Sequence, residues 1–107
     1  MVGDIVWAPF PLTSPGNTKV RPVLVVADVR DGTEDDWIVC EITSSPMTHT
    51  REIEITRNDM AWGGLRRASK VRPDRLTTLN QSVFQDTAGH LADAKLAEIS
   101  TSIRGLF

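Results

Sequence analysis

Short apolar runs separated by polar turn residues fill most of the chain, a pattern that is typical of a series of β-strands. Residues 4–9 are predicted to form the first strand and residues 20–27 the second. The run 23–27 is apolar throughout, as expected of a central strand covered on both faces. A third strand is predicted at residues 37–42, antiparallel to the second because the connection is short. The polar segment 11–19 between the first two strands is expected to be a surface loop.

The middle of the chain is predicted to add further strands and a turn. Charged and apolar residues alternate in residues 52–55, which predicts a strand with one face in water. Residues 62–65 contain two glycines and are predicted to form a turn. Residues 69–79 are predicted to form one or two strands interrupted by Pro73, which cannot donate an amide proton and is therefore expected at an edge or bulge. The basic residues of this segment are thus expected on a sheet edge.

The end of the chain changes from a strand-like to a helical period. From Asp93 onward, apolar residues recur every three or four positions, namely Leu96, Ile99, Ile103 and Leu106. Asp93 is the expected N-cap, and Gly105 is the expected stop. This predicts an amphipathic C-terminal helix whose apolar stripe packs against the sheet.

Length and composition are those of one ordinary domain, which we place at residues 1–107. The chain is 40% hydrophobic and 24% charged, and no apolar run approaches the roughly 20 residues needed to span a membrane. The first residues resemble a strand rather than a signal peptide. We therefore expect a cytoplasmic protein without a membrane partner.

The sequence predicts neither a disulfide nor a metal site. Cys40 is the single cysteine, and only His49 and His90 accompany it as nitrogen ligands, so no spaced ligand set for structural zinc is present. We expect Cys40 to be a small buried strand residue, both histidines to lie on the surface, and the protein to need no cofactor.

Charge is distributed unevenly around a net value of -2. Residues 1–50 hold three basic groups against seven acidic ones, whereas residues 51–107 hold nine against seven. Five basic residues offset by one aspartate cluster within ten positions, namely Arg66, Arg67, Lys70, Arg72 and Arg75. Such a cluster binds phosphates or forms a solvated face with local ion pairs, and the sequence leaves both readings open.

Three blocks of sequence carry a resemblance to a known family. They are residues 3–11 (GDIVWAPFP), residues 19–26 (KVRPVLVV) and residues 65–72 (LRRASKVR). In this order they resemble the MazF/PemK (Kid) toxins of type II toxin-antitoxin systems. The resemblance covers nearly the whole chain and implies a small, twisted, SH3-like barrel with a C-terminal helix, acting as a homodimer.

The same resemblance implies an activity and a partner. Family members cut single-stranded RNA at short sequences without a metal, through attack of the 2′-OH on the adjacent phosphate. Such mRNA interferases inhibit translation and growth. A cognate antitoxin silences them, and the basic cluster together with the resemblance predicts that it is acidic and partly disordered.

Arg21 and Thr43 are the first candidates for catalysis. The resemblance maps the catalytic pair of MazF-like members onto them. A guanidinium fixed before Pro22 would clamp a phosphate bidentately, although it is a poor base. From the sequence alone, the plainer alternatives are an ordinary ion pair for Arg21 and a strand-end hydroxyl bonded to its own backbone for Thr43.

Arg72 and Asp74 are the second candidate pair, because the Kid-like branch uses an arginine and an aspartate two residues apart. Residues two apart on a strand face the same side, so Asp74 would serve as base and Arg72 as oxyanion stabiliser. The alternative is a local salt bridge. Both pairs together are a further option.

Secondary RNA contacts are expected from five residues: Lys19, Ser44, Ser45, Lys70 and Trp62. The loop from Leu12 to Lys19 is expected to close over RNA or to bind the antitoxin. Trp62 is expected to be exposed and able to stack on a base. Core or dimer packing is expected of Trp7 and Trp37.

Two competing functions stay open. The fold is shared with CcdB, a gyrase inhibitor that cuts nothing, so a non-enzymatic inhibitor is one alternative. The other is a degenerate member that binds RNA or antitoxin without catalysis, which the net acidity makes relevant.

Overall fold

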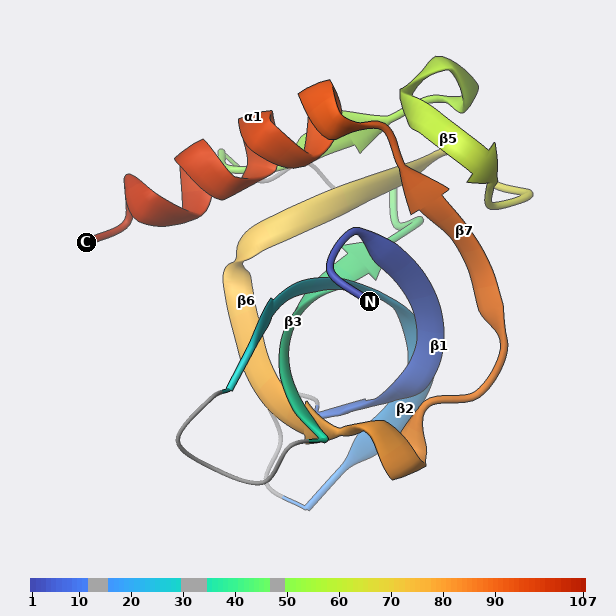
Figure 1. Ribbon diagram of the computed structural model, residues 1–107, viewed down its shortest axis with the longest axis vertical. Coiled ribbons are helices and arrows are strands. Elements are labelled where there is room, and N and C mark those ends of the chain that lie inside the picture. Colours follow the sequence, from blue (N-terminus) through green and yellow to red (C-terminus); the bar gives the residue numbers. More distant parts are fainter. Residues whose placement is uncertain (12–15, 30–34, 47–49) are drawn as a thin grey trace.

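In the part of the chain that the structure describes, seven antiparallel strands form one curled sheet, and one α-helix packs across it (Figure 1). The computed structural model describes residues 1–11, 16–29, 35–46 and 50–107. The order across the sheet is β4-β6-β3-β2-β1-β7-β5. The elements are β1 Asp4–Pro11, β2 Thr18–Asp28, β3 Asp36–Thr43, β4 Ile53–Ile55, η1 Arg57–Asp59, β5 Met60–Gly63, β6 Ser69–Asn80, η2 Gln81–Val83, β7 Thr87–Leu91 and α1 Asp93–Arg104.

The central strands β1, β2 and β3 confirm the sequence predictions for this part of the chain. β2 pairs antiparallel with both β1 and β3. Its residues Val23, Leu24 and Val25 are fully buried and contribute to two different apolar clusters. Leu24 belongs to the cluster that also includes Ile99 of α1, whereas Val23 and Val25 belong to the cluster enclosed by the curl. A strand buried on both faces explains why its apolar run does not alternate.

A break in β6 confirms the bulge expected at Pro73. Cys40 of β3 pairs with Leu76, but the next residue, Glu41, pairs with Arg72. Residues 73–75 therefore have no partner on β3, and the proline needs no ladder hydrogen bond there. β4 pairs with β6 only over residues 69–71. The sheet edge that was expected for the whole segment 69–79 is therefore found only after residue 71.

The predicted turn at residues 62–65 begins two residues too early, because Met60–Gly63 is strand β5 and the connection to β6 begins at Gly64. β5 pairs with β7, which the sequence did not predict. Gly63 stands opposite Gly89 with φ +69°, and a Cβ on Gly63 would lie 2.3 Å from the Ala88 carbonyl oxygen. The glycines thus serve a close approach of two strands as well as a turn.

The helix α1 spans Asp93–Arg104 and confirms the predicted C-terminal helix. Ile99 is buried, and Leu96 and Ile103 pack against the same cluster. The cap differs from the prediction, since Ala92 is the N-cap and Asp93 lies in the first turn, where its charge still favours the helix dipole. Gly105 ends the helix as expected. Among the described residues, no helix is long and apolar enough to cross a membrane.

His90 is half-buried, which corrects the expectation of a bland surface residue. Its Nδ1 lies 2.8 Å from Asp4 Oδ1, and the ring packs over Gly3. This contact fastens β7 to the beginning of β1. His49 lies outside the described residues, as do residues 12–15 of the predicted loop.

Candidate active site

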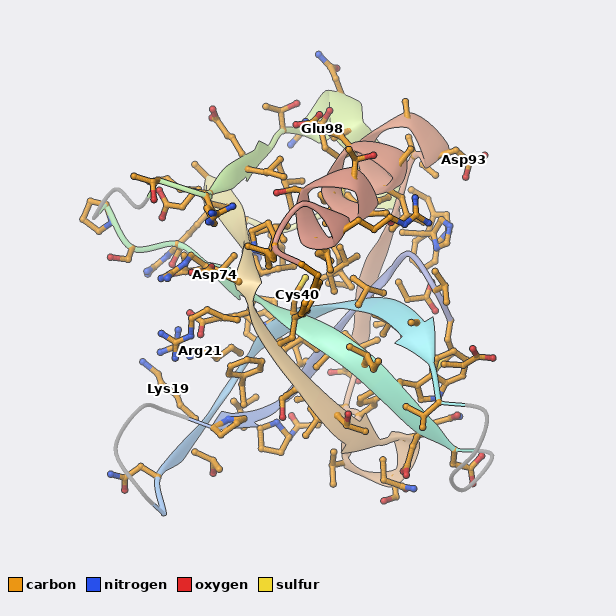
Figure 2. The ribbon with its side chains drawn as sticks, turned by 90° about the vertical axis from the view of Figure 1, so that its left-hand side faces the viewer. Lys19, Arg21, Cys40, Asp74, Asp93 and Glu98 are labelled. Atoms are coloured by element: carbon orange, nitrogen blue, oxygen red, sulfur yellow. The ribbon has the colours of Figure 1, made fainter. Side chains whose placement is uncertain are left out.

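A cavity of about 740 Å³ collects five of the predicted site residues. Its walls come from the start of β2, the end of β3 and the segment between β5 and β6. Figure 2 shows Lys19 and Arg21 next to each other on one side of the molecule. The predicted residues that line the cavity are Lys19, Arg21, Thr43, Ser44 and Ser45, and the other lining residues are Trp7, Val20, Pro22, Ile42, Gly64, Leu65, Arg66, Arg67, Ser69 and Ala88.

The cavity is strongly cationic although the protein is acidic overall. Four basic side chains line it, namely Lys19, Arg21, Arg66 and Arg67. No carboxylate and no histidine is among its described lining residues. Guanidinium, ammonium and hydroxyl groups without a carboxylate suit an anionic ligand such as a phosphodiester.

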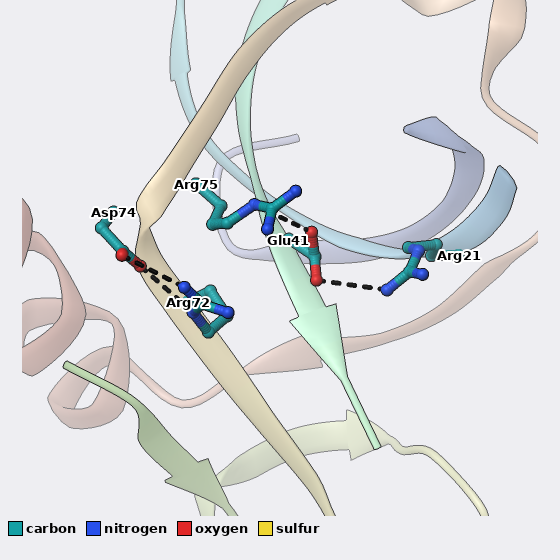
Figure 3. Close-up of polar contacts among 5 residues, drawn as sticks. All are labelled: Arg21, Glu41, Arg72, Asp74 and Arg75. Atoms are coloured by element: carbon teal, nitrogen blue, oxygen red, sulfur yellow. Dashed lines mark hydrogen bonds and ion pairs between the residues drawn. The ribbon is translucent and has the colours of Figure 1, made fainter. Parts of the chain in front are cut away.

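The guanidinium of Arg21 is paired with the buried carboxylate of Glu41 (Figure 3). Its Nη1 donates to Glu41 Oε1 at 3.2 Å, and the Glu41 side chain is only 6% exposed. Arg75 Nε lies 3.3 Å from Glu41 Oε2, an ion pair that lacks hydrogen-bond geometry. Glu41 therefore lies between two guanidinium groups. The Nε of Arg21 is buried and finds no hydrogen-bond partner in the described part of the chain.

Thr43 is the last residue of β3, and its hydroxyl shapes the turn that follows. Its Oγ1 accepts a hydrogen bond from the Ser45 backbone N–H at 3.1 Å. The side chain is nearly buried, and the bond turns Ser44 and Ser45 toward the cavity wall. The contacts considered as alternatives, an ion pair for Arg21 and a backbone bond for Thr43, are thus both present. They orient these groups at the cavity.

Arg72 and Asp74 form a separate pair that does not line the cavity. Arg72 Nε donates to Asp74 Oδ1 and Arg72 Nη2 to Asp74 Oδ2, both at 3.2 Å. These hydrogen bonds from Arg72 lower the pKa of Asp74 below its usual value. A carboxylate stabilised in this way is a weaker base. Arg21 and Thr43 line the same cavity, whereas Arg72 and Asp74 lie outside it.

The remaining predicted contacts lie away from the cavity. Lys70 Nζ is 3.4 Å from Glu52 Oε1. Trp62 is 55% exposed, as expected, but lines neither this cavity nor its neighbour. Trp7 is 37% exposed and lines the cavity, so the core alternative expected for it is wrong, and dimer packing stays a prediction. Trp37 packs on the inner apolar cluster and donates its indole N–H to Gln81.

The sequence did not single out Glu41, Arg66 or Arg67 as site residues. Glu41 follows Cys40 within an otherwise apolar strand. This position was the signal in the sequence that its carboxylate is buried and therefore needs a cationic partner. Arg66 and Arg67 belonged to the basic cluster, but their place beside Arg21 depends on the long-range pairing of β5 and β7. Among the described residues, no group of three or more His, Cys, Asp or Glu side chains could hold a metal ion.

The described residues thus form a small protein of one curled antiparallel sheet, a C-terminal helix and a cationic cavity. The chain belongs to the family of PemK-like, MazF-like toxins of type II toxin-antitoxin systems, whose sequence model matches residues 1–107. This confirms the resemblance found in the sequence. Comparison with curated proteins gave no significant match.

Solved structures confirm the predicted fold. MazF (Form-I) from Deinococcus radiodurans is 20% identical, with a TM-score of 0.75 over 98% of this chain and 93% of that chain. An endoribonuclease in complex with its cognate antitoxin from Mycobacterial species is 18% identical, with a TM-score of 0.72 over 98% of this chain and 91% of that chain. The Mycobacterium tuberculosis toxin MazF-mt6 is 22% identical, with a TM-score of 0.65 over 94% and 93%.

Proposed function

We propose that this toxin is a metal-independent endoribonuclease that cuts single-stranded RNA, messenger RNA above all, and thereby inhibits translation and growth. The observation that carries the proposal is the cavity beside Arg21, whose described lining residues include four cations and no carboxylate in a protein of net charge -2. The cavity is open to solvent and large enough for a nucleotide. The endoribonucleases among the structural neighbours support the same activity.

In the proposed reaction the 2′-oxygen bonds to phosphorus and the 5′-oxygen leaves, which yields a 2′,3′-cyclic phosphate and a 5′-hydroxyl. Negative charge accumulates on the phosphoryl oxygens, and Arg21 stabilises it. Arg21 acts through charge rather than as the base, because its guanidinium stays protonated. The hydroxyls of Thr43, Ser44 and Ser45 position the phosphate. The 2′-oxygen loses its proton to solvent as it attacks, and the 5′-oxygen takes a proton from solvent as it leaves, because the cavity is open and neither a carboxylate nor a histidine is among its described lining residues. Arg72 and Asp74, which lie outside the cavity, are proposed only in second place as a proton-transfer pair.

The partners proposed for this chain follow from its relatives. One neighbour is described in complex with its cognate antitoxin, and we propose an acidic, partly disordered antitoxin for this toxin. We further propose that it acts in the cytoplasm as a homodimer. No feature of the described residues favours gyrase inhibition over RNA cleavage.

The test is cleavage of a long single-stranded RNA in excess EDTA, with the 5′ ends mapped. We expect cuts at a recurring short motif, and a rate at least about 100-fold lower for Arg21→Ala, because one stabilising donor is worth that much. Arg104→Ala, which removes an exposed arginine of α1, is the matched control and should cut normally. Folded wild-type protein that leaves RNA intact but blocks gyrase supercoiling would refute the proposal.

A further inference from the structure

A second cavity, of about 570 Å³, adjoins the first. Both cavities are lined by Gly64, Leu65, Arg66, Arg67 and Ser69. The segment that connects β5 to β6 is therefore a common wall between them. A ligand that fills the first cavity and continues past this wall enters the second.

Charge in the second cavity favours an anion. Three arginines line it, Arg57, Arg66 and Arg67, against one carboxylate, Glu54. All three arginines are exposed, and none has an ion-pair partner among the described residues. This differs from Arg21, Arg72 and Arg75, whose guanidinium groups are engaged by carboxylates. Unpaired guanidinium groups at a shared wall are suited to bind backbone phosphates.

The floor of the second cavity is apolar. Ile55 is buried there, and Met60 and Leu65 are half-buried beside it. An apolar floor under a cationic rim matches a nucleotide, whose base is flat and apolar on its faces and whose phosphate is charged. The cavity volume also lies within the range of about 300–1,000 Å³ that is common for small-ligand sites.

We propose that the second cavity binds a further nucleotide of the same RNA strand that is cut in the first. Arg66 and Arg67 bind the phosphate that crosses the shared wall, and Arg57 binds the next phosphate. The base rests on Met60 and Leu65. This inference rests on the proposed function, because it assumes that the occupant of the first cavity is RNA.

Binding can be measured without cleavage, using a fluorescent single-stranded RNA whose 2′-hydroxyls are all replaced by fluorine. Each lost phosphate contact should make the slope of log affinity against log salt shallower by about 0.7. We expect a change of about 0.7 for the double variant Arg66→Ala/Arg67→Ala, whose two arginines share one phosphate, and a further change of about 0.7 for Arg57→Ala, measured by anisotropy from about 50 to about 200 mM salt. Arg104→Ala should leave the slope unchanged.

Arg57 and Glu54 make the experiment specific for the second cavity, because neither lines the first. Glu54→Gln removes the one carboxylate and should tighten RNA binding about two- to fivefold, opposite to Arg57→Ala. All variants should keep the wild-type circular dichroism spectrum, since both side chains are exposed.

The outcomes separate this inference from the proposed function. Wild-type protein that binds and cuts RNA, with slope and affinity unaffected by Arg57→Ala and Glu54→Gln, overturns the second nucleotide site alone. Wild-type protein that neither binds nor cuts RNA overturns the proposed function. If Arg57→Ala weakens binding of an acidic antitoxin peptide but not of RNA, the cavity is a protein site and the inference is wrong.

Discussion

At the scale of single residues, the unusual group is the carboxylate of Glu41. Burial of a charge is costly unless it is paired, and Glu41 is paired twice, with Arg21 and with Arg75. The two ion pairs stabilise the folded protein. The contact with Glu41 also restricts the rotamers of Arg21, so that its guanidinium stays at the cavity wall.

Glu41→Gln keeps the shape of this side chain and removes its charge. We expect the free energy of unfolding to fall by about 1.5–3 kcal/mol, because a charge-assisted hydrogen bond and an ion pair are lost. We also expect the kcat of RNA cleavage to fall at least tenfold with KM unchanged or lower, since Arg21 loses its anchor but the site becomes more positive. Urea unfolding and steady-state kinetics measure both.

The control for this substitution is Glu98→Gln, which removes a 56% exposed carboxylate from an ion pair with Lys95 on α1. Its effect on stability should stay within about 0.5 kcal/mol. A Glu41→Gln protein with wild-type kcat would show that Glu41 does not position Arg21.

The predicted site residues that share one cavity are those that lie close together along the chain or that the resemblance indicated. Arg21, Thr43, Ser44 and Ser45 meet in one cavity as expected, although their roles are still proposals. Glu41 was missed because a glutamate in a strand is usually solvated, and only the three-dimensional pairing reveals its burial.

At the scale of elements, the close pairing of β5 and β7 positions the wall between the two cavities. Gly63 and Gly89 face each other, and the Gly64 N–H donates to the Ala88 carbonyl at 3.0 Å. Neither glycine leaves room for a side chain. Strands that pair through glycines show no alternation of apolar and polar side chains. This explains why β1, β2 and β3 could be predicted from the sequence and β5 and β7 could not.

Gly63→Ala tests this contact. Its φ of +69° disfavours any Cβ, and that Cβ would also overlap the Ala88 carbonyl, so we expect a loss of at least about 3 kcal/mol in stability. Gly16→Ala is the matched control, because Gly16 has φ +80° with nothing within 4 Å of a Cβ. It should cost only the backbone term of about 1–2 kcal/mol. Equal losses in thermal or urea unfolding would mean that the strand contact adds nothing.

At the scale of the whole molecule, two apolar clusters on opposite faces of one sheet are joined through the same strands. Cys40 lies in the middle of the structure, in the cluster covered by α1 (Figure 2). Burial raises the pKa of its thiol to about 12 from an ordinary value of 9.0. The thiol is therefore unreactive near neutral pH in the folded protein, whereas in the unfolded chain it titrates near its ordinary value.

This pKa shift couples global stability to alkaline pH. Because the folded pKa is raised, the stability that Cys40 contributes is complete below pH 9 and declines as pH rises from there toward 12. Between about pH 7.5 and about pH 10, wild type should lose about 1.4 kcal/mol of unfolding free energy relative to Cys40→Ala, as measured by urea unfolding. A difference between the two proteins that stays constant over this range would contradict the buried thiol.

The pairing of β1 with β7 has a consequence for the order in which the protein is made. Asp4 meets His90, and the cavity walls extend from Trp7 to Ala88. A nascent chain can complete neither the sheet nor the cavity until β7 has left the ribosome, and such long-range pairing forms slowly. The cavity is thus incomplete until Thr87–Leu91 has emerged from the ribosome, so a shorter growing chain has no such site to offer a ligand.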